Sequence, residues 1–249
     1  MADTGKPVKV APADAEAKNL WSELGRLASQ VLPKGWTLVG GLMVQLHAFE
    51  AGASDVRATT DIDILGNARV RTDFEKIARA LSDDGFKLDP PSPIDRISHR
   101  WRRGGLVVDL LAPDGLRENP PVADGLSTVQ IPGGTQALER TETIEVEIGH
   151  TLVKLSRPTL LGAVLIKARA IMEHADPDAQ RADLVLLLSF VDDPGQTAAE
   201  LKGKERNWLR DCQALLGLDD PVLMAAFPRT KVQRAQLAYQ LLVAGRVAD

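Results

Sequence analysis

The sequence predicts an α/β (α+β) protein in which a half with a mixed β-sheet is followed by an all-helical half. Short apolar runs with β-branched residues alternate with runs of helical spacing up to about residue 156. After Arg157 every apolar run has helical spacing, and the first of these runs starts with a proline, as first turns often do. The predicted parts are a disordered tail over residues 1–13, a sheet-containing domain over 14–156 and a helical domain over 157–249.

The first half contains strands and helices at short spacing. Apolar residues at helical intervals indicate a helix from Asp14 to about Val31. The other predicted elements are a strand over 36–41 that ends in a glycine pair, a helix over 42–51, a strand over 60–65, a helix over 72–84, a hairpin over 95–113 that turns at Gly104–Gly105, and a weaker strand pair over 143–148 and 151–155. The predicted helices of the second half cover 158–175, 178–191, 197–218, 220–227 and 230–245.

Composition narrows the class of protein. The 249 residues are 44% hydrophobic and carry a net charge of −4, which disfavours a uniformly basic nucleic-acid binder but leaves room for a local basic groove. Cys212 is the single cysteine, so no intrachain disulfide or cysteine-rich zinc site is expected. The first residues lack the apolar core of a signal peptide, and no apolar run approaches the ~20 residues of a membrane span. A cytoplasmic protein without a membrane partner is therefore expected.

Three aspartates lie in strands of the first half. Asp61 and Asp63 are one residue apart on the strand over 60–65, so both side chains point to one side of it. Asp109 lies in the apolar strand of the hairpin. Each alone also reads as a hydrogen-bonded core acid or a cap. Together, with no basic residue expected among them, they form a negative site that only cations make tolerable, and oxygen ligands suit Mg²⁺ or Mn²⁺.

A glycine pair, Gly40–Gly41, joins the preceding strand to a helix. Such a pair is usually only a tight turn. At the start of a helix, however, it also lets backbone N–H groups approach a phosphate closely. A phosphate cradle beside a carboxylate metal site describes nucleotidyl transfer by in-line attack.

These motifs, "LVGGLMVQLH", "RATTDIDIL" and "VVDLLAP", resemble the nucleotidyltransferases of the DNA polymerase β superfamily. Within it, the arrangement resembles the abortive-infection toxins of AbiEii type, over residues 36–190. The resemblance implies a minimal nucleotidyltransferase domain over 14–156 and a helical domain that completes the cleft. It also implies that Gly40 and Gly41 hold the triphosphate, that Asp61 and Asp63 bind metal, and that Asp109 shares a metal and accepts the proton of the attacking hydroxyl.

In the toxin relatives a lysine and an acid on C-terminal helices complete the site, which implies that Lys167 is catalytic and binds phosphate and that Asp183 binds nucleotide. Both are charges inside apolar helices, so a buried Lys–Asp pair that joins two helices is the alternative. Those relatives often carry an arginine one turn beyond the lysine; here Arg169 and Arg181 are the nearby candidates. Arg57 is expected either to approach a triphosphate or to lie on the surface.

The arm over residues 96–103 is rich in arginine. Alternation places Arg96, Ser98, Arg100 and Arg102 on one face. This face is either a ridge that grips the phosphates of an RNA acceptor or a solvated strand edge.

The resemblance thus implies a Mg²⁺-dependent enzyme that moves NMP from an NTP, such as ATP or CTP, to a hydroxyl. The implied acceptor is the 3′ end of tRNA, and the implied role is a toxin with a cognate antitoxin protein. The alternatives are transfer to a small molecule or a protein side chain, and a non-catalytic nucleotide-binding module. The presence of all three acids and both glycines argues against the last of these.

Overall fold

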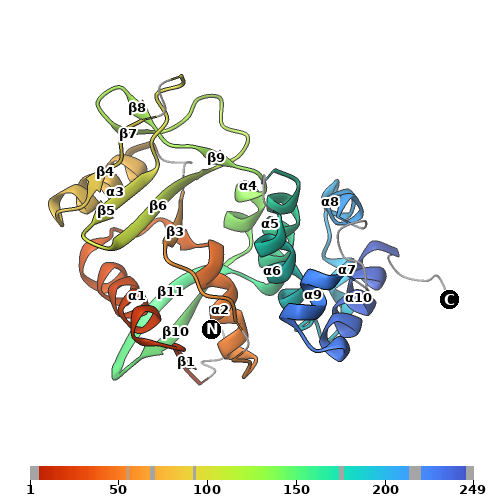
Figure 1. The fold of residues 1–249 in the computed structure, drawn as a ribbon. Helices are drawn as coiled ribbons and strands as arrows, with labels where there is room; N and C mark the ends of the chain where they lie inside the picture. Colours follow the sequence, from red (N-terminus) through yellow and green to blue (C-terminus); the bar gives the residue numbers. More distant parts are fainter. Residues whose placement is uncertain are drawn as a thin grey trace. The chain divides into compact units, whose positions relative to one another are not determined.

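The computed structural model describes residues 6–54, 56–67, 71–91, 94–173, 177–212 and 220–244. The chain forms two compact units, Met1–Pro158 and Thr159–Asp249. The described strands all belong to the first unit, and the described elements of the second are all helices (Figure 1). The predicted α/β (α+β) class, with a mixed sheet followed by an all-helical half, is confirmed.

The larger sheet of the first unit has six strands. Their order is β2-β3-β6-β5-β4, and β9 pairs with the end of β6. The pairs β3–β6 and β6–β9 are parallel and the others antiparallel, so the sheet is mixed. The bounds are β2 Trp36–Leu38, β3 Ile62–Gly66, β4 Lys87–Leu88, β5 Arg100–Arg103, β6 Leu106–Pro113 and β9 Gln130–Ile131.

A capping aspartate and a buried aromatic ring fix two helices of this unit. Asp14 caps the first helix by accepting a hydrogen bond from the Ala17 N–H at 2.8 Å. On α3 (Arg71–Asp83), the Phe74 ring packs against β3, so close that a Cβ at Gly66 would lie 2.7 Å from it. The bounds are α1 Ala15–Arg26, continued by the π-helix η1 Leu27–Val31, α2 Gly40–Glu50, α3 Arg71–Asp83 and α4 Gly134–Glu139.

A second sheet contains the short N-terminal strand β1 (Val8–Lys9), followed by β10 (Thr141–Ile148) and β11 (Thr151–Pro158). Val8 pairs in parallel with Val146 and is buried. The predicted disordered tail over residues 1–13 is therefore wrong for this strand, because the open edge of β10 offers hydrogen-bond partners that a local sequence pattern does not reveal. Residues 1–5 lie outside the described residues. A further two-stranded ribbon consists of β7 (Pro121–Ala123) and β8 (Leu126–Ser127).

The elements described in the second unit are all helices. The bounds are α5 Leu160–Glu173, α6 Asp178–Leu188, α7 Pro194–Ala199, α8 Glu205–Asp211, α9 Pro221–Ala226 and α10 Arg229–Ala244. The single helix predicted over 197–218 is interrupted between α7 and α8 by Gly203, whose φ of 46° is left-handed. Its last part, 213–218, lies outside the described residues. Among the described helices, none has the length and apolarity that a bilayer crossing requires.

A buried histidine anchors α2 to the end of the second sheet. His47 is 4% exposed, and its Nε2 lies 3.0 Å from the Pro158 carbonyl oxygen, to which it donates as a neutral ring. Burial, and then the nearby Arg157 charge, lower the pKa of His47 from 6.5 to about 3. Glu50 lies 3.9 Å from His47 Nδ1 but also binds Arg157, so it does not make the ring charged.

We expect His47 to make folding sensitive to mild acid. Its folded pKa lies below its unfolded pKa, so its stabilising contribution is present above pH 6.5 and is lost as pH falls toward 3. The free energy of unfolding should fall by about 2 kcal/mol from this residue between about pH 7.5 and about pH 5. Urea titrations should show a flatter pH dependence for His47→Gln. The control variant His150→Gln, at an exposed position, should show the same dependence of unfolding free energy on pH as wild type. An equally steep dependence in wild type and His47→Gln would contradict the prediction.

Candidate metal site

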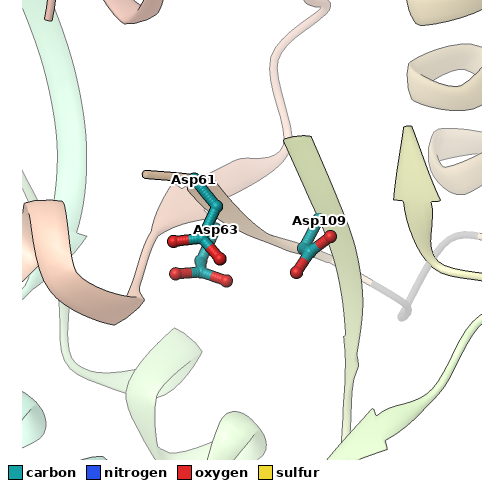
Figure 2. A group of neighbouring side chains, drawn as sticks. All are labelled: Asp61, Asp63 and Asp109. Carbon is teal, nitrogen blue, oxygen red and sulfur yellow. The ribbon is translucent and has the colours of Figure 1, made fainter. Parts of the chain in front are cut away.

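The structure brings Asp61, Asp63 and Asp109 together at neighbouring strands. Asp63 and Asp109 are direct partners across the parallel pair β3–β6, and Asp61 precedes β3 by one residue (Figure 2). One oxygen from each carboxylate lies within 4.8 Å of the other two. Asp109 is buried, and the other two are partly exposed. Three carboxylates at this spacing offer the hard oxygen donors that Mg²⁺ and Mn²⁺ prefer, so the residues fit a divalent ion.

The glycine pair lies directly against these acids. Gly40 begins α2 with a left-handed φ of 68°, and a Cβ there would lie 1.8 Å from Asp63 Oδ2. A Cβ at Gly41 would lie 2.7 Å from the Thr59 hydroxyl oxygen, and that hydroxyl donates to Asp61 Oδ1 at 2.9 Å. The first turn of α2, with its free N–H groups and positive dipole end, therefore approaches the carboxylates as only glycines allow.

We expect Gly40→Ala to displace Asp63 and to weaken Mn²⁺ binding at least about tenfold, because a ligand that leaves its position loses its share of the binding free energy. Gly52→Ala is the matched control. Gly52 has the same left-handed conformation, with a φ of 70°, but a Cβ there meets nothing within 4 Å. Both variants should lose about 1–2 kcal/mol from backbone strain. Only Gly40→Ala should change the Mn²⁺ dissociation constant measured by electron paramagnetic resonance, and equal affinities would contradict the prediction.

A basic residue does lie among the acids, which corrects the expectation that none would. Arg100 donates to both oxygens of Asp109, from Nε at 2.9 Å and from Nη2 at 2.7 Å, and the same Nη2 lies 3.7 Å from Asp61 Oδ2. The hairpin turn at Gly104–Gly105 sets Arg100 directly opposite Asp109. This register was a signal in the sequence that could have revealed the contact.

The other members of the arginine-rich face have separate contacts. Arg102 donates from Nε to Asp89 at 2.8 Å, and the Ser98 hydroxyl donates to the Asp89 carbonyl. Arg96 is exposed and has a left-handed φ of 56°. Two of the arginines thus pair with acids of the first unit. Arg57, which precedes the acids in the chain, donates to the Ala58 carbonyl at 3.1 Å and is partly exposed.

Lys167 and Asp183 form a buried pair in the second unit. Lys167 Nζ lies 2.8 Å from Asp183 Oδ2 and donates to Gln180 Oε1 at 2.9 Å, and the two charged side chains are 5% and 2% exposed. These contacts are those of the structural alternative, a Lys–Asp pair that joins α5 to α6. Of the two arginine candidates, Arg181 binds Asp178 and Asp220, and Arg169 lies 3.4 Å from Glu173.

Comparison with known proteins gives a likeness to solved structures. The sequence matches no protein-family model and no curated protein. Among solved structures, the chain is similar to an antigenic nucleotidyltransferase-like protein from Paracoccidioides brasiliensis, with a TM-score of 0.43 and 15% sequence identity over 96% of this chain and 97% of that one.

Proposed function

We propose that this protein is a metal-dependent nucleotidyltransferase that moves NMP from an NTP, such as ATP or CTP, to a hydroxyl acceptor. One observation carries the proposal: three aspartates with oxygens within 4.8 Å of one another lie beside a glycine-initiated helix start. Carboxylates alone suggest a cation site. The neighbouring helix start adds a place for phosphate, and Mg²⁺ held by a few carboxylates usually serves substrate phosphates.

Each residue then has a defined task. Asp61, Asp63 and Asp109 would hold Mg²⁺ or Mn²⁺. The metal would neutralise phosphate charge and make the attacking hydroxyl easier to deprotonate. The N–H groups at Gly40–Gly41 bind phosphate oxygens. The acceptor oxygen bonds to the α-phosphorus, the bond from that phosphorus to the bridging oxygen breaks, and pyrophosphate leaves. By the family resemblance, Asp109 takes the hydroxyl proton.

The finer parts of the proposal come from the AbiEii resemblance. The acceptor is the 3′ end of tRNA, and the protein is the toxin of a pair whose partner is an antitoxin protein. Arg57 contacts the triphosphate in this scheme. For Lys167 and Asp183 the resemblance implies nucleotide contact, whereas the 2.8 Å pair between them supports a role in holding the helices together.

The test is incubation of the purified protein with Mg²⁺, total tRNA and each of the four NTPs, radiolabelled at the α-phosphate. Label in the tRNA band, lost on omission of Mg²⁺ and in Asp63→Asn, is the expected result. Label in the protein band instead would replace tRNA by a protein side chain as acceptor. The absence of NTP binding and of transfer to tRNA, protein or an added aminoglycoside would contradict nucleotidyl transfer itself.

A further inference from the structure

Arg100 holds the third aspartate from the neighbouring strand. Both oxygens of Asp109 accept from the same guanidinium, at 2.9 and 2.7 Å, in the two-pronged geometry that makes arginine–carboxylate pairs strong. Asp109 lies on the internal strand β6 and its side chain is 7% exposed, whereas the Arg100 side chain is 37% exposed. The acid is therefore fixed in place, and the arginine has solvent into which its guanidinium can turn.

The guanidinium responds to the whole cluster. Its pKa is raised, first by the hydrogen bonds to Asp109 and further by the charges of Asp109, Asp61 and Asp63, although burial opposes the shift. Three carboxylates and one guanidinium sum to a charge of −2 among these four residues. A cation bound between the same acids would face Arg100 at short range, where like charges destabilise one another.

We propose that Arg100 is an exchangeable countercharge, which holds Asp109 while the aspartates carry no metal and gives up both of its hydrogen bonds to Asp109, the one from Nε included, when a divalent metal binds. The inference rests on the metal site of the proposed function and makes Arg100 a positioning residue. While no metal is bound, the Arg100 guanidinium keeps the three mutually repelling carboxylates together. The affinity for metal is lower than it would be without Arg100, because the metal must displace this guanidinium from Asp109.

The first test measures Mn²⁺ dissociation constants by electron paramagnetic resonance. Arg100→Gln removes the competing charge and should bind Mn²⁺ about tenfold more tightly than wild type. Arg102→Gln is the matched control: it removes one positive charge two residues along the same strand, from a side chain paired with Asp89, and should stay within about twofold of wild type. Arg100→Lys cannot form the two-pronged pair but keeps the positive charge that competes with the metal, so its Mn²⁺ dissociation constant should remain within about threefold of wild type.

The second test reads out the wild-type protein, so its result does not depend on the metal affinity of a variant. The nitrogen-15 resonance of Arg100 Nε–H, assigned by its loss in Arg100→Lys, should be protected from solvent exchange without metal. Saturating Mg²⁺ should shift it and remove that protection, while the Arg102 Nε–H stays unchanged.

The two proposals fail in different ways. If the wild type binds no Mn²⁺ or Mg²⁺, the proposed metal-dependent function fails and the exchange fails with it. The countercharge role alone is overturned if the wild type binds Mn²⁺ and Arg100→Gln binds it equally or more weakly. It is also overturned if Mg²⁺ leaves the Arg100 Nε–H resonance unchanged.

Discussion

Asp63→Asn is expected to reduce nucleotidyl transfer by about a thousandfold or more, because several kcal/mol of transition-state charge stabilisation depend on the bound metal. Asp63 is central to the site: it pairs with Asp109 in the parallel register and lies against Gly40. Asparagine keeps the shape of the side chain and removes one of three like charges, so the fold should be retained. The measurements are transfer of α-labelled NMP, the Mn²⁺ dissociation constant and the melting temperature of the same preparation.

The matched control is Asp89→Asn. Asp89 is also an aspartate near β5 that binds an arginine, but its partner is Arg102, away from the three acids. This variant should keep full activity within about twofold, as surface changes usually do. Wild-type activity in Asp63→Asn, with unchanged Mn²⁺ affinity, would remove the metal assignment. Loss of activity together with loss of the fold would point to a structural carboxylate instead.

The clustering of the three aspartates could be anticipated from the sequence because two of them lie on one strand and the third lies in an apolar strand of the same half. Alternation along a strand puts Asp61 and Asp63 on one side, and the parallel neighbour brings Asp109 opposite Asp63. The position of the glycine pair between a strand and a helix predicted its phosphate-binding role. The structure adds the reason for glycine, since a Cβ at Gly40 would overlap the Asp63 carboxylate.

The features that sequence reasoning missed depend on which strands pair and in which register. Arg100 faces Asp109 through the hairpin register, and single-strand alternation placed it only on a face. The strand β1 forms because β10, far along the chain, offers a free edge to Val8 and Lys9. No apolar periodicity marks either contact. The sequence predicts no elements between β7 and α4, because the strands there are only two or three residues long.

For Lys167 the sequence predicted burial but not the partner. Its position in an apolar helix predicted that it is buried and needs an anion, and it is 4% exposed. Which anion it meets depends on how α5 packs on α6. In the structure that anion is Asp183, and Gln180 from the same helix accepts a second hydrogen bond.

Lys167→Met is therefore expected to destabilise the fold by about 3–5 kcal/mol, since it leaves the Asp183 carboxylate buried without this countercharge. The melting temperature should fall by roughly 10 °C. The double variant Lys167→Met/Asp183→Leu removes both charges and should recover most of the loss, because a well-packed apolar pair often matches a buried ion pair in stability. Lys202→Met replaces an exposed lysine of the same unit and should change stability by less than about 0.5 kcal/mol.

Nucleotide affinity separates this role from phosphate binding. If Lys167 only joins α5 to α6, the double variant should fold and bind NTP with a dissociation constant within about twofold of wild type, because no phosphate contact has been removed. If Lys167 also serves phosphate, the double variant should fold but bind NTP at least about tenfold more weakly, as loss of a charged hydrogen bond costs about 1.5–3 kcal/mol. Near-normal stability of Lys167→Met together with weakened NTP binding would overturn the structural role, because removing one partner of a buried ion pair is expected to destabilise the fold.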